Sequence, residues 1–273
     1  LEADADPTIS VGGILPSIGG NIRVGQSETF VTEACEYTNS FLSFFPKISA
    51  ILNIDADHLD FFKDLQDIRN SFRKFACLLP ADGTLVINGE IENVSEITHD
   101  LPCRVITYGF SEDFDVYATD ITFDAMARGS YRIHLKKDGS ETVFPVSLGV
   151  TGRHNISNSM AAIAIAYLLP GGNPEAICEA LKSFSGTDRR FQYKGKLLET
   201  TIIDRNNRDF KNSAELSAQK ALVCLPAAYL HAYQSASAGI CKSTFPRRSC
   251  CTGRYLRSKG NRYTRHQLPY FTG

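Results

Sequence analysis

Short apolar runs separated by polar segments fill the first two thirds of the chain, and two of them end in acidic or histidine residues. Residues 48–54 (ISAILNI) predict a buried strand, because the run is short, apolar and without alternation. It leads towards His58, and the run at residues 30–31 leads into Glu33. In open parallel sheets ligands bind beyond the carboxyl ends of the strands, so we expect Glu33 and His58 to face one crevice. Carboxylate and imidazole ligands there would suit a magnesium ion that carries nucleotide phosphates; the alternative is that both residues merely lie in loops.

The spacing of apolar residues predicts several further elements. Residues 65–79 place their apolar positions on one face of a helix, and residues 84–88 (TLVIN) predict the next buried strand. Residues 104–148 hold β-branched, partly alternating runs with no helix between them, which favours a small antiparallel sheet beside the parallel one. The Ala-rich residues 156–169 and the segment 173–181, which opens with Asn-Pro-Glu, predict two more helices. The pattern therefore indicates an α/β fold with a mostly parallel sheet flanked by helices.

Polar residues at the start of the Ala-rich helix form a second candidate site. Asn155 and Asn158 are three residues apart, so both amides can point the same way, and an amide can pair with the edge of an adenine. N-capping explains Asn155 equally well. The glycine-rich segment at residues 12–21 (GGILPSIGGN) predicts turns, but no stretch of the chain matches the GxxxxGK[ST] phosphate loop.

Acidic and basic residues are distributed unevenly along the chain, although its formal net charge is only −1. From Leu197 onward there are 12 Lys/Arg and 4 Asp/Glu, and the residues from Leu216 to Gly273 include no carboxylate. A basic tail with interleaved tyrosines is typical of nucleic-acid binding. The same tail has neither helical nor strand periodicity and no apolar face, which instead indicates a sequence that was not selected for folding. We prefer this second interpretation.

Length and cysteine content narrow the class of protein. A chain of 273 residues has room for one large or two ordinary domains. Its eight cysteines form no CxxC pair, so neither a zinc site nor a redox motif is indicated, and a reduced, cytoplasmic setting is expected. No apolar run reaches the length of a membrane span, and Leu1 does not open a signal peptide. A chain that opens Leu-Glu-Ala is expected to be a fragment or a processed product.

Five segments, taken together, resemble the Mur ligase family. They are DPTISVGGILPSIGGNIRVG, VTEACEYTNSFLSF, ISAILNIDADHLDFF, GRHNISNSMAAIAIA and FSGTDRRFQYKG, and they follow the family's order and spacing over residues 6–195. The resemblance implies that residues 1–195 are the family's central, ATP-binding domain, with a P-loop-type sheet. Residues 196–273 would then be the remnant of a carboxyl-terminal domain, an irregular tail.

The resemblance also implies an activity. It is that of an ATP-dependent ligase of peptidoglycan biosynthesis, which joins L-alanine to the lactyl carboxylate of UDP-N-acetylmuramate through an acyl phosphate. ATP and Mg²⁺ would be the cofactors, because magnesium and cationic side chains neutralise the charge that gathers between phosphates and a carboxylate. The protein would act in the cytoplasm, with no nucleic acid and no membrane insertion. The alternatives are a tripeptide-adding recycling ligase, a folylpolyglutamate synthetase-like enzyme, and a nucleic-acid-binding protein that uses the basic tail.

The family's motifs assign roles to seven positions of this sequence. They are Glu33 and His58 as catalytic magnesium ligands, Asn155 and Asn158 as adenine contacts with His154 beside them, Arg190 as a phosphate-side or interdomain contact, and Asn21 near the sugar-nucleotide substrate.

The chain departs from the family's pattern at both ends. The family's P-loop, GTHGKT, and its UDP-binding domain are expected just before residue 1, and its usual continuation is missing after Asp204. Codons can be chosen for residues 214–229 so that the neighbouring frame reads NYPHKRLWCAFQPHTY, which resembles the missing domain. We therefore hypothesise a frameshift near Asp204, with out-of-frame and disordered residues beyond it, which the underlying DNA would test. Because two of three substrate sites lack their residues, we expect this chain by itself to be inactive.

Overall fold

The protein is described by a computed structural model that covers residues 1, 5–169, 172–187, 192–197, 200–204 and 222–225; for the last three ranges it describes only the backbone. All of these residues belong to one unit, residues 1–227. Arg190 and the tail beyond residue 225 lie outside the described residues, so the predictions for them are not addressed by the structure.

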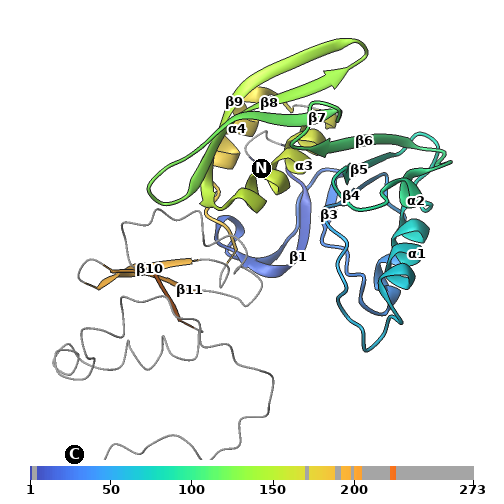
Figure 1. Cartoon of the computed structure of the whole chain (residues 1–273), viewed down its shortest axis with the longest axis horizontal. Helices are drawn as coiled ribbons and strands as arrows, with labels where there is room; N and C mark the ends of the chain where they lie inside the picture. The colour runs from blue at the N-terminus through green and yellow to red at the C-terminus, as the bar shows by residue number, and fades with distance from the viewer. Residues whose placement is uncertain (2–4, 170–171, 188–191, 198–199, 205–221, 226–273) are drawn as a thin grey trace, which may run out of the picture. The chain divides into compact units, whose positions relative to one another are not determined.

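A six-stranded sheet forms the centre of the fold, in the order β4-β5-β6-β7-β8-β9 (Figure 1). Its strands are β4 (Ile48–Ile51), β5 (Thr84–Asn88), β6 (Arg104–Gly109), β7 (Val116–Phe123), β8 (Arg128–Lys137) and β9 (Ser140–Thr151). The strands from β4 to β7 run parallel, and β7, β8 and β9 pair antiparallel. The expected antiparallel strands are therefore present, but they extend the parallel sheet through backbone hydrogen bonds instead of forming a sheet beside it.

Two three-stranded sheets accompany the central sheet. The first has the order β2-β1-β3, with β1 (Thr8–Leu15), β2 (Gly20–Arg23) and β3 (Phe30–Thr32); the second joins β10 (Gln192–Leu197), β11 (Thr200–Asp204) and β12 (Leu222–Leu225). A turn was expected at Gly12-Gly13, but both residues lie inside β1. Gly12 lies close to Glu33 there: a Cβ at this position would lie 3.1 Å from the Glu33 carboxylate. β12 is a strand in a segment that was expected to be irregular.

The predicted helices are confirmed as α1 (Leu65–Ala76), α3 (Arg153–Leu168) and α4 (Pro174–Ser183), and short helices η1 (Pro16–Ile18), η2 (Tyr37–Ser43) and α2 (Ser95–Thr98) complete the fold. α1 begins at Asp64, whose side chain accepts a hydrogen bond from Asp67 N at 2.8 Å. α4 begins at Asn173, which accepts one from Ala176 N at 2.8 Å. Both caps satisfy backbone donors that a helix start otherwise leaves without partners.

Helices cover both faces of the central sheet, as the side chains of β5 show. Val86 packs into a core with α3, whereas Leu85 and Ile87 pack into a second core with α1 and α2. The alternation follows from the strand geometry, in which successive side chains point to opposite faces. All three residues are fully buried, as expected for a parallel strand between two helical layers.

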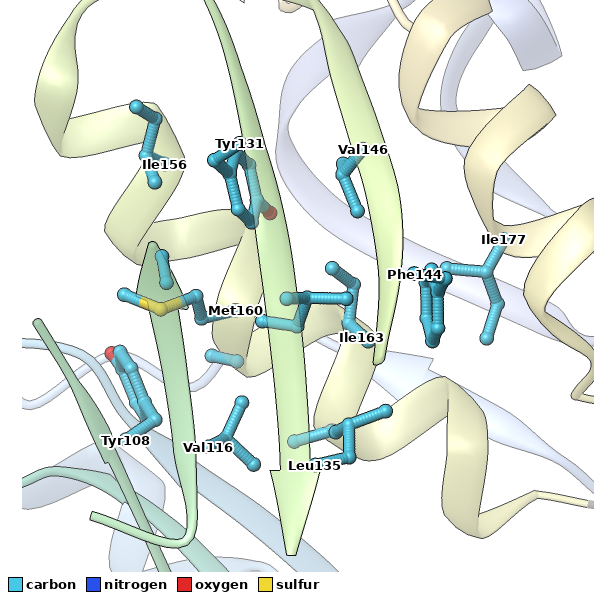
Figure 2. Packing of buried hydrophobic residues seen from close by; sticks show 14 of the residues in the cluster. Tyr108, Val116, Tyr131, Leu135, Phe144, Val146, Ile156, Met160, Ile163 and Ile177 are labelled. Atoms are coloured by element: carbon cyan, nitrogen blue, oxygen red, sulfur yellow. The ribbon is translucent and has the colours of Figure 1, made fainter. Parts of the chain in front are cut away.

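Helix α3 owes its position to an apolar stripe. Ile156, Met160 and Ile163 recur at intervals of three and four residues, are fully buried, and point at the strands of the sheet (Figure 2). Tyr131 of β8 lies against the same helix, and its hydroxyl is 2.6 Å from that of Ser159. The predicted helix is therefore fixed by burial of one face.

None of the helices in the described part of the chain is both long enough and apolar enough to span a bilayer.

Candidate functional site

The carboxyl ends of three parallel strands and the start of α3 lie along one edge of the central sheet. Leu52 O, just after β4, accepts a hydrogen bond from Asn88 Nδ2 at the end of β5 at 3.2 Å. Glu90 Oε1, just after β5, accepts one from the backbone N–H of Phe110 at 3.3 Å. The guanidinium carbon of Arg153, the first residue of α3, is 4.1 Å from the ring centroid of Phe110. These contacts bring two predicted sites, one after β4 and one at the start of α3, to the same sheet edge, where ligands of parallel sheets bind.

The loop after β4 brings His58 to two carboxylates. Glu36, Asp57 and His58 each offer one ligand atom, and these atoms lie within 4.8 Å of one another. His58 Nε2 is 3.6 Å from Glu36 Oε1, and the backbone N–H of His58 donates to Asp57 Oδ1 at 3.0 Å. His58 adopts a left-handed backbone with φ +55°, and its carbonyl accepts hydrogen bonds from two later backbone N–H groups. The loop thus fixes the imidazole beside an acid that lies 22 residues earlier in the chain.

The donor set of this group fits a small divalent cation. Two carboxylates and one imidazole, all half-buried, surround a space that a single ion can bridge. Magnesium in nucleotide-dependent proteins is typically held by one or two carboxylates, with substrate phosphates and water filling its other positions. Glu36, Asp57 and His58 are therefore the residues of the described structure that would hold Mg²⁺.

Tyr37, at the start of η2, holds His58 from one side. Its ring centroid is 4.6 Å from that of His58, with 30° between the ring planes, and its hydroxyl donates to Asp60 Oδ2 at 2.8 Å. The hydrogen bond to the Asp60 carboxylate raises the pKa of Tyr37 above its ordinary value, because the bond favours the neutral phenol. The tyrosine therefore remains a donor at neutral pH and links the imidazole to an acid two residues further along the loop.

Glu33 lies at the end of β3, where its carboxylate is engaged by the backbone. Glu33 Oε2 accepts a hydrogen bond from Gly12 N at 2.7 Å, and Glu33 does not belong to the group formed by Glu36, Asp57 and His58. β3 and β4 also lie in different sheets, so the two strand ends are not neighbours in one sheet as the sequence pattern indicated. The shared role of Glu33 and His58 as magnesium ligands stays a prediction.

The residues predicted to contact adenine lie in the first turns of α3. Asn155 is inside the helix and its Nδ2 donates to Thr151 O at 2.8 Å, so the N-capping alternative for Asn155 is wrong. The helix begins instead at Gly152, whose φ of +95° lies outside the range that other residues readily adopt. Asn158 is exposed and His154 is half-buried.

Asn21, which was predicted to lie near the sugar-nucleotide substrate, is exposed on β2. The described contacts join it to neither the His58 group nor α3, and its role also stays a prediction.

Sequence reasoning missed Glu36, Asp57 and Tyr37 as members of the site. Asp57 had a local signal, since it stands directly before His58 in the loop after an apolar strand. Glu36 stands three residues after Glu33 and carries the same chemistry, so residue type alone does not choose between them. The tertiary contacts decide: the Glu33 carboxylate accepts a hydrogen bond from Gly12 N, whereas Glu36 Oε1 lies 3.6 Å from His58 Nε2.

Comparison with known proteins identifies the family. A model of the Mur ligase middle domain matches residues 15–166. The UDP-N-acetylmuramate–L-alanine ligase of Agathobacter rectalis is 55% identical over 204 residues, which make up 75% of this chain and 44% of that protein. The ligase of the same name from Clostridium botulinum is 50% identical over 204 residues, 43% of its length. The chain thus spans less than half the length of these curated relatives.

Solved structures agree with this result. The UDP-N-acetylmuramate-alanine ligase of Thermotoga maritima superposes with a TM-score of 0.60 at 26% identity, over 75% of this chain and 45% of that one. The UDP-N-acetylmuramate:L-alanyl-gamma-D-glutamyl-meso-diaminopimelate ligase of Neisseria meningitides gives 0.58 at 26% identity, over 69% and 60%. These matches confirm the resemblance found in the sequence motifs. The chain belongs to the Mur ligase family.

Proposed function

We propose that this chain supplies the ATP- and magnesium-binding domain of a ligase that joins L-alanine to UDP-N-acetylmuramate in cytoplasmic peptidoglycan synthesis. The observation that carries the proposal is the 55% identity to a UDP-N-acetylmuramate–L-alanine ligase over 204 residues. A tripeptide-adding ligase remains the alternative, because such an enzyme has a similar fold at 26% identity. The higher identity favours the L-alanine ligase.

The arrangement of the candidate site supports ATP-dependent chemistry. Glu36, Asp57 and His58 would hold Mg²⁺, which supplies charge neutralisation when a phosphoryl group moves to a carboxylate. Tyr37 orients the imidazole, and the start of α3 presents Asn155 and Asn158 at the same sheet edge for a nucleotide base. An exposed amide such as that of Asn158 can both donate to and accept from an adenine edge.

The domain does not catalyse the reaction by itself in this proposal. The curated relatives are more than twice as long as the matched segment, and the chain contains no GxxxxGK[ST] phosphate loop. Without the lysine and hydroxyl of such a loop, the β- and γ-phosphates lack their usual cradle. We expect no ATP-dependent product from this polypeptide alone.

A chimeric enzyme tests the proposal. The 204 matched residues of the Agathobacter rectalis ligase are replaced by the corresponding residues of this chain, and ATP-dependent joining of L-alanine to UDP-N-acetylmuramate is measured. We expect product from the chimera, a loss of at least about 100-fold on His58→Ala, and no loss on His99→Ala. His99 is an exposed histidine paired with Asp100, and it serves as the matched control. A folded chimera that keeps full activity after His58→Ala would refute the role of the site.

A further inference from the structure

Apolar side chains remain exposed around the His58 group, the cluster of Glu36, Asp57 and His58. Among the described residues they are Tyr37, which is 38% exposed, Leu59 at 57% and Phe61 at 43%. Tyr37 follows Glu36 directly in the chain, and Leu59 follows His58. Exposed apolar side chains that gather at one place usually mark a binding surface, whereas scattered single ones carry no such meaning.

Ring contacts connect Phe61 to the imidazole of His58. The ring centroid of Tyr37 is 4.6 Å from that of His58 and 6.1 Å from that of Phe61, and the planes of Tyr37 and Phe61 meet at 76°. Edge-to-face aromatic pairs at such separations attract each other. Phe61 therefore lies one ring away from the residue that would hold the cation.

The backbone holds Phe61 in its exposed position. The N–H groups of Phe61 and Phe62 both donate to His58 O, at 2.9 and 3.0 Å. Phe62 is only 3% exposed, and its ring centroid is 4.9 Å from that of Phe61, with 85° between the planes. The buried ring of Phe62 anchors this turn, so the neighbouring Phe61 is an ordered part of the surface beside His58.

Water competes with the amine in the proposed reaction. In ligation the amine nitrogen attacks the acyl carbon of the acyl phosphate, the carbon–oxygen bond to phosphate breaks, and the nitrogen loses a proton as the amide forms. In hydrolysis the oxygen of water attacks the same carbon, the same bond breaks, and the free carboxylate and a proton are released. Both routes release phosphate, but only ligation gives product. An apolar side chain at the reaction centre favours ligation, because exclusion of water prevents hydrolysis of reactive intermediates.

We propose that Phe61 shields the reaction centre beside the His58 group from water, so that the acyl phosphate forms an amide instead of being hydrolysed. The inference rests on the proposed function, since a ligase of this type has an acyl phosphate to protect. The two sides of the site then have separate tasks. The carboxylates and imidazole of the His58 group would hold the cation, and Phe61 limits the water that reaches the intermediate.

The chimeric ligase measures this shielding as a coupling ratio, the amount of amide product formed per phosphate released in the same reaction. We expect about one product per phosphate in the unaltered chimera, less than about one half in Phe61→Ala, and a nearly unaltered ratio in Phe61→Leu, which stays apolar. Phe45→Ala is the matched control, because Phe45 is 97% exposed and precedes β4, whereas the His58 loop follows it. Its ratio should equal that of the unaltered chimera.

The coupling ratio distinguishes a water shield from a residue that only supports the fold. Damage to the fold lowers phosphate release and product formation in equal proportion, so it leaves the ratio unchanged. An unchanged ratio in Phe61→Ala, at any total rate, would overturn the inference and leave the proposed function intact. Absence of product from the unaltered chimera would instead refute the proposed function, and the inference with it.

A second measurement, which needs no turnover, tests whether Phe61 lies beside the ion. Bound Mn²⁺ broadens the NMR signals of nuclei close to it, whereas diamagnetic Mg²⁺ does not. In the 273-residue chain we expect substoichiometric Mn²⁺ to broaden the ring signals of Phe61 together with those of His58. Phe61 signals that stay sharp while those of His58 broaden would contradict its place at the site. If Mn²⁺ broadens neither set of signals, the coupling ratio decides the question.

Discussion

Removal of the Tyr37 ring should weaken divalent-metal binding at His58. In the structure the centroid of the Tyr37 ring lies 4.6 Å from that of the His58 imidazole, and its hydroxyl donates to Asp60 at 2.8 Å, so Tyr37 would support His58 as the proposed metal ligand without contacting the metal itself. Loss of such a partner typically lowers metal affinity by about 10- to 100-fold. We expect this range for Tyr37→Ala. Tyr37→Phe keeps the ring against His58 and loses only an exposed hydrogen bond, so its loss should stay below about threefold.

Titration of the chain with Mn²⁺, followed by electron paramagnetic resonance, measures this affinity. Phe45→Ala is the matched control, because Phe45 is an aromatic residue that is 97% exposed and has no described ring contact with His58. Since the hydrogen bond to the Asp60 carboxylate raises the pKa of Tyr37 above its ordinary value, the phenol stays protonated and the contact persists at neutral pH; the contact is lost only when the pH rises through that raised pKa. Unchanged Mn²⁺ affinity in Tyr37→Ala, or an equal loss in Phe45→Ala, would refute the positioning role.

Three further predictions concern stability and titration. Ile163→Ala removes a fully buried side chain of the core and should lower the free energy of unfolding by about 2–5 kcal/mol in urea denaturation. Gly152→Ala should destabilise by about 1–2 kcal/mol, because the φ of +95° is strained for alanine and a Cβ would lie 2.7 Å from the His154 ring; Gly19→Ala, with open space around it, should cost less in the same assay. The hydrogen bond to Glu141 raises the pKa of Tyr117 to about 12 and the same bond lowers that of Glu141. The contribution of Tyr117 to the stability of the fold is therefore complete below pH 10 and lost as the pH rises through about 12. The contribution of Glu141 is lost as the pH falls through its lowered pKa. In a carboxyl NMR titration Tyr117→Phe should shift the Glu141 pKa upward, and an unshifted value would contradict the assignment.

The sequence alone determined the local elements and the family. The apolar runs and spacings gave β4, β5 and three helices close to their observed bounds, because strand and helix periods are properties of neighbouring residues. The motifs identified the family because five of them occur in order, although each is weak alone. His58 was found for a local reason as well, since it follows an apolar run that forms β4; that strand was expected to be buried, but only Ser49 and Ile51 of its four residues are buried.

Only the tertiary structure decided which residues meet. Glu36 rather than Glu33 stands beside His58, and the Glu33 carboxylate instead accepts a hydrogen bond from Gly12 N of β1. The contact of Arg153 with Phe110 joins residues that are far apart in sequence, and it places the start of α3 at the carboxyl edge of the sheet. The position of the antiparallel strands was also decided only in the folded chain, where they extend the parallel sheet. The alternation of apolar and polar residues within a strand shows which face is buried, but it does not show which other strand pairs with it.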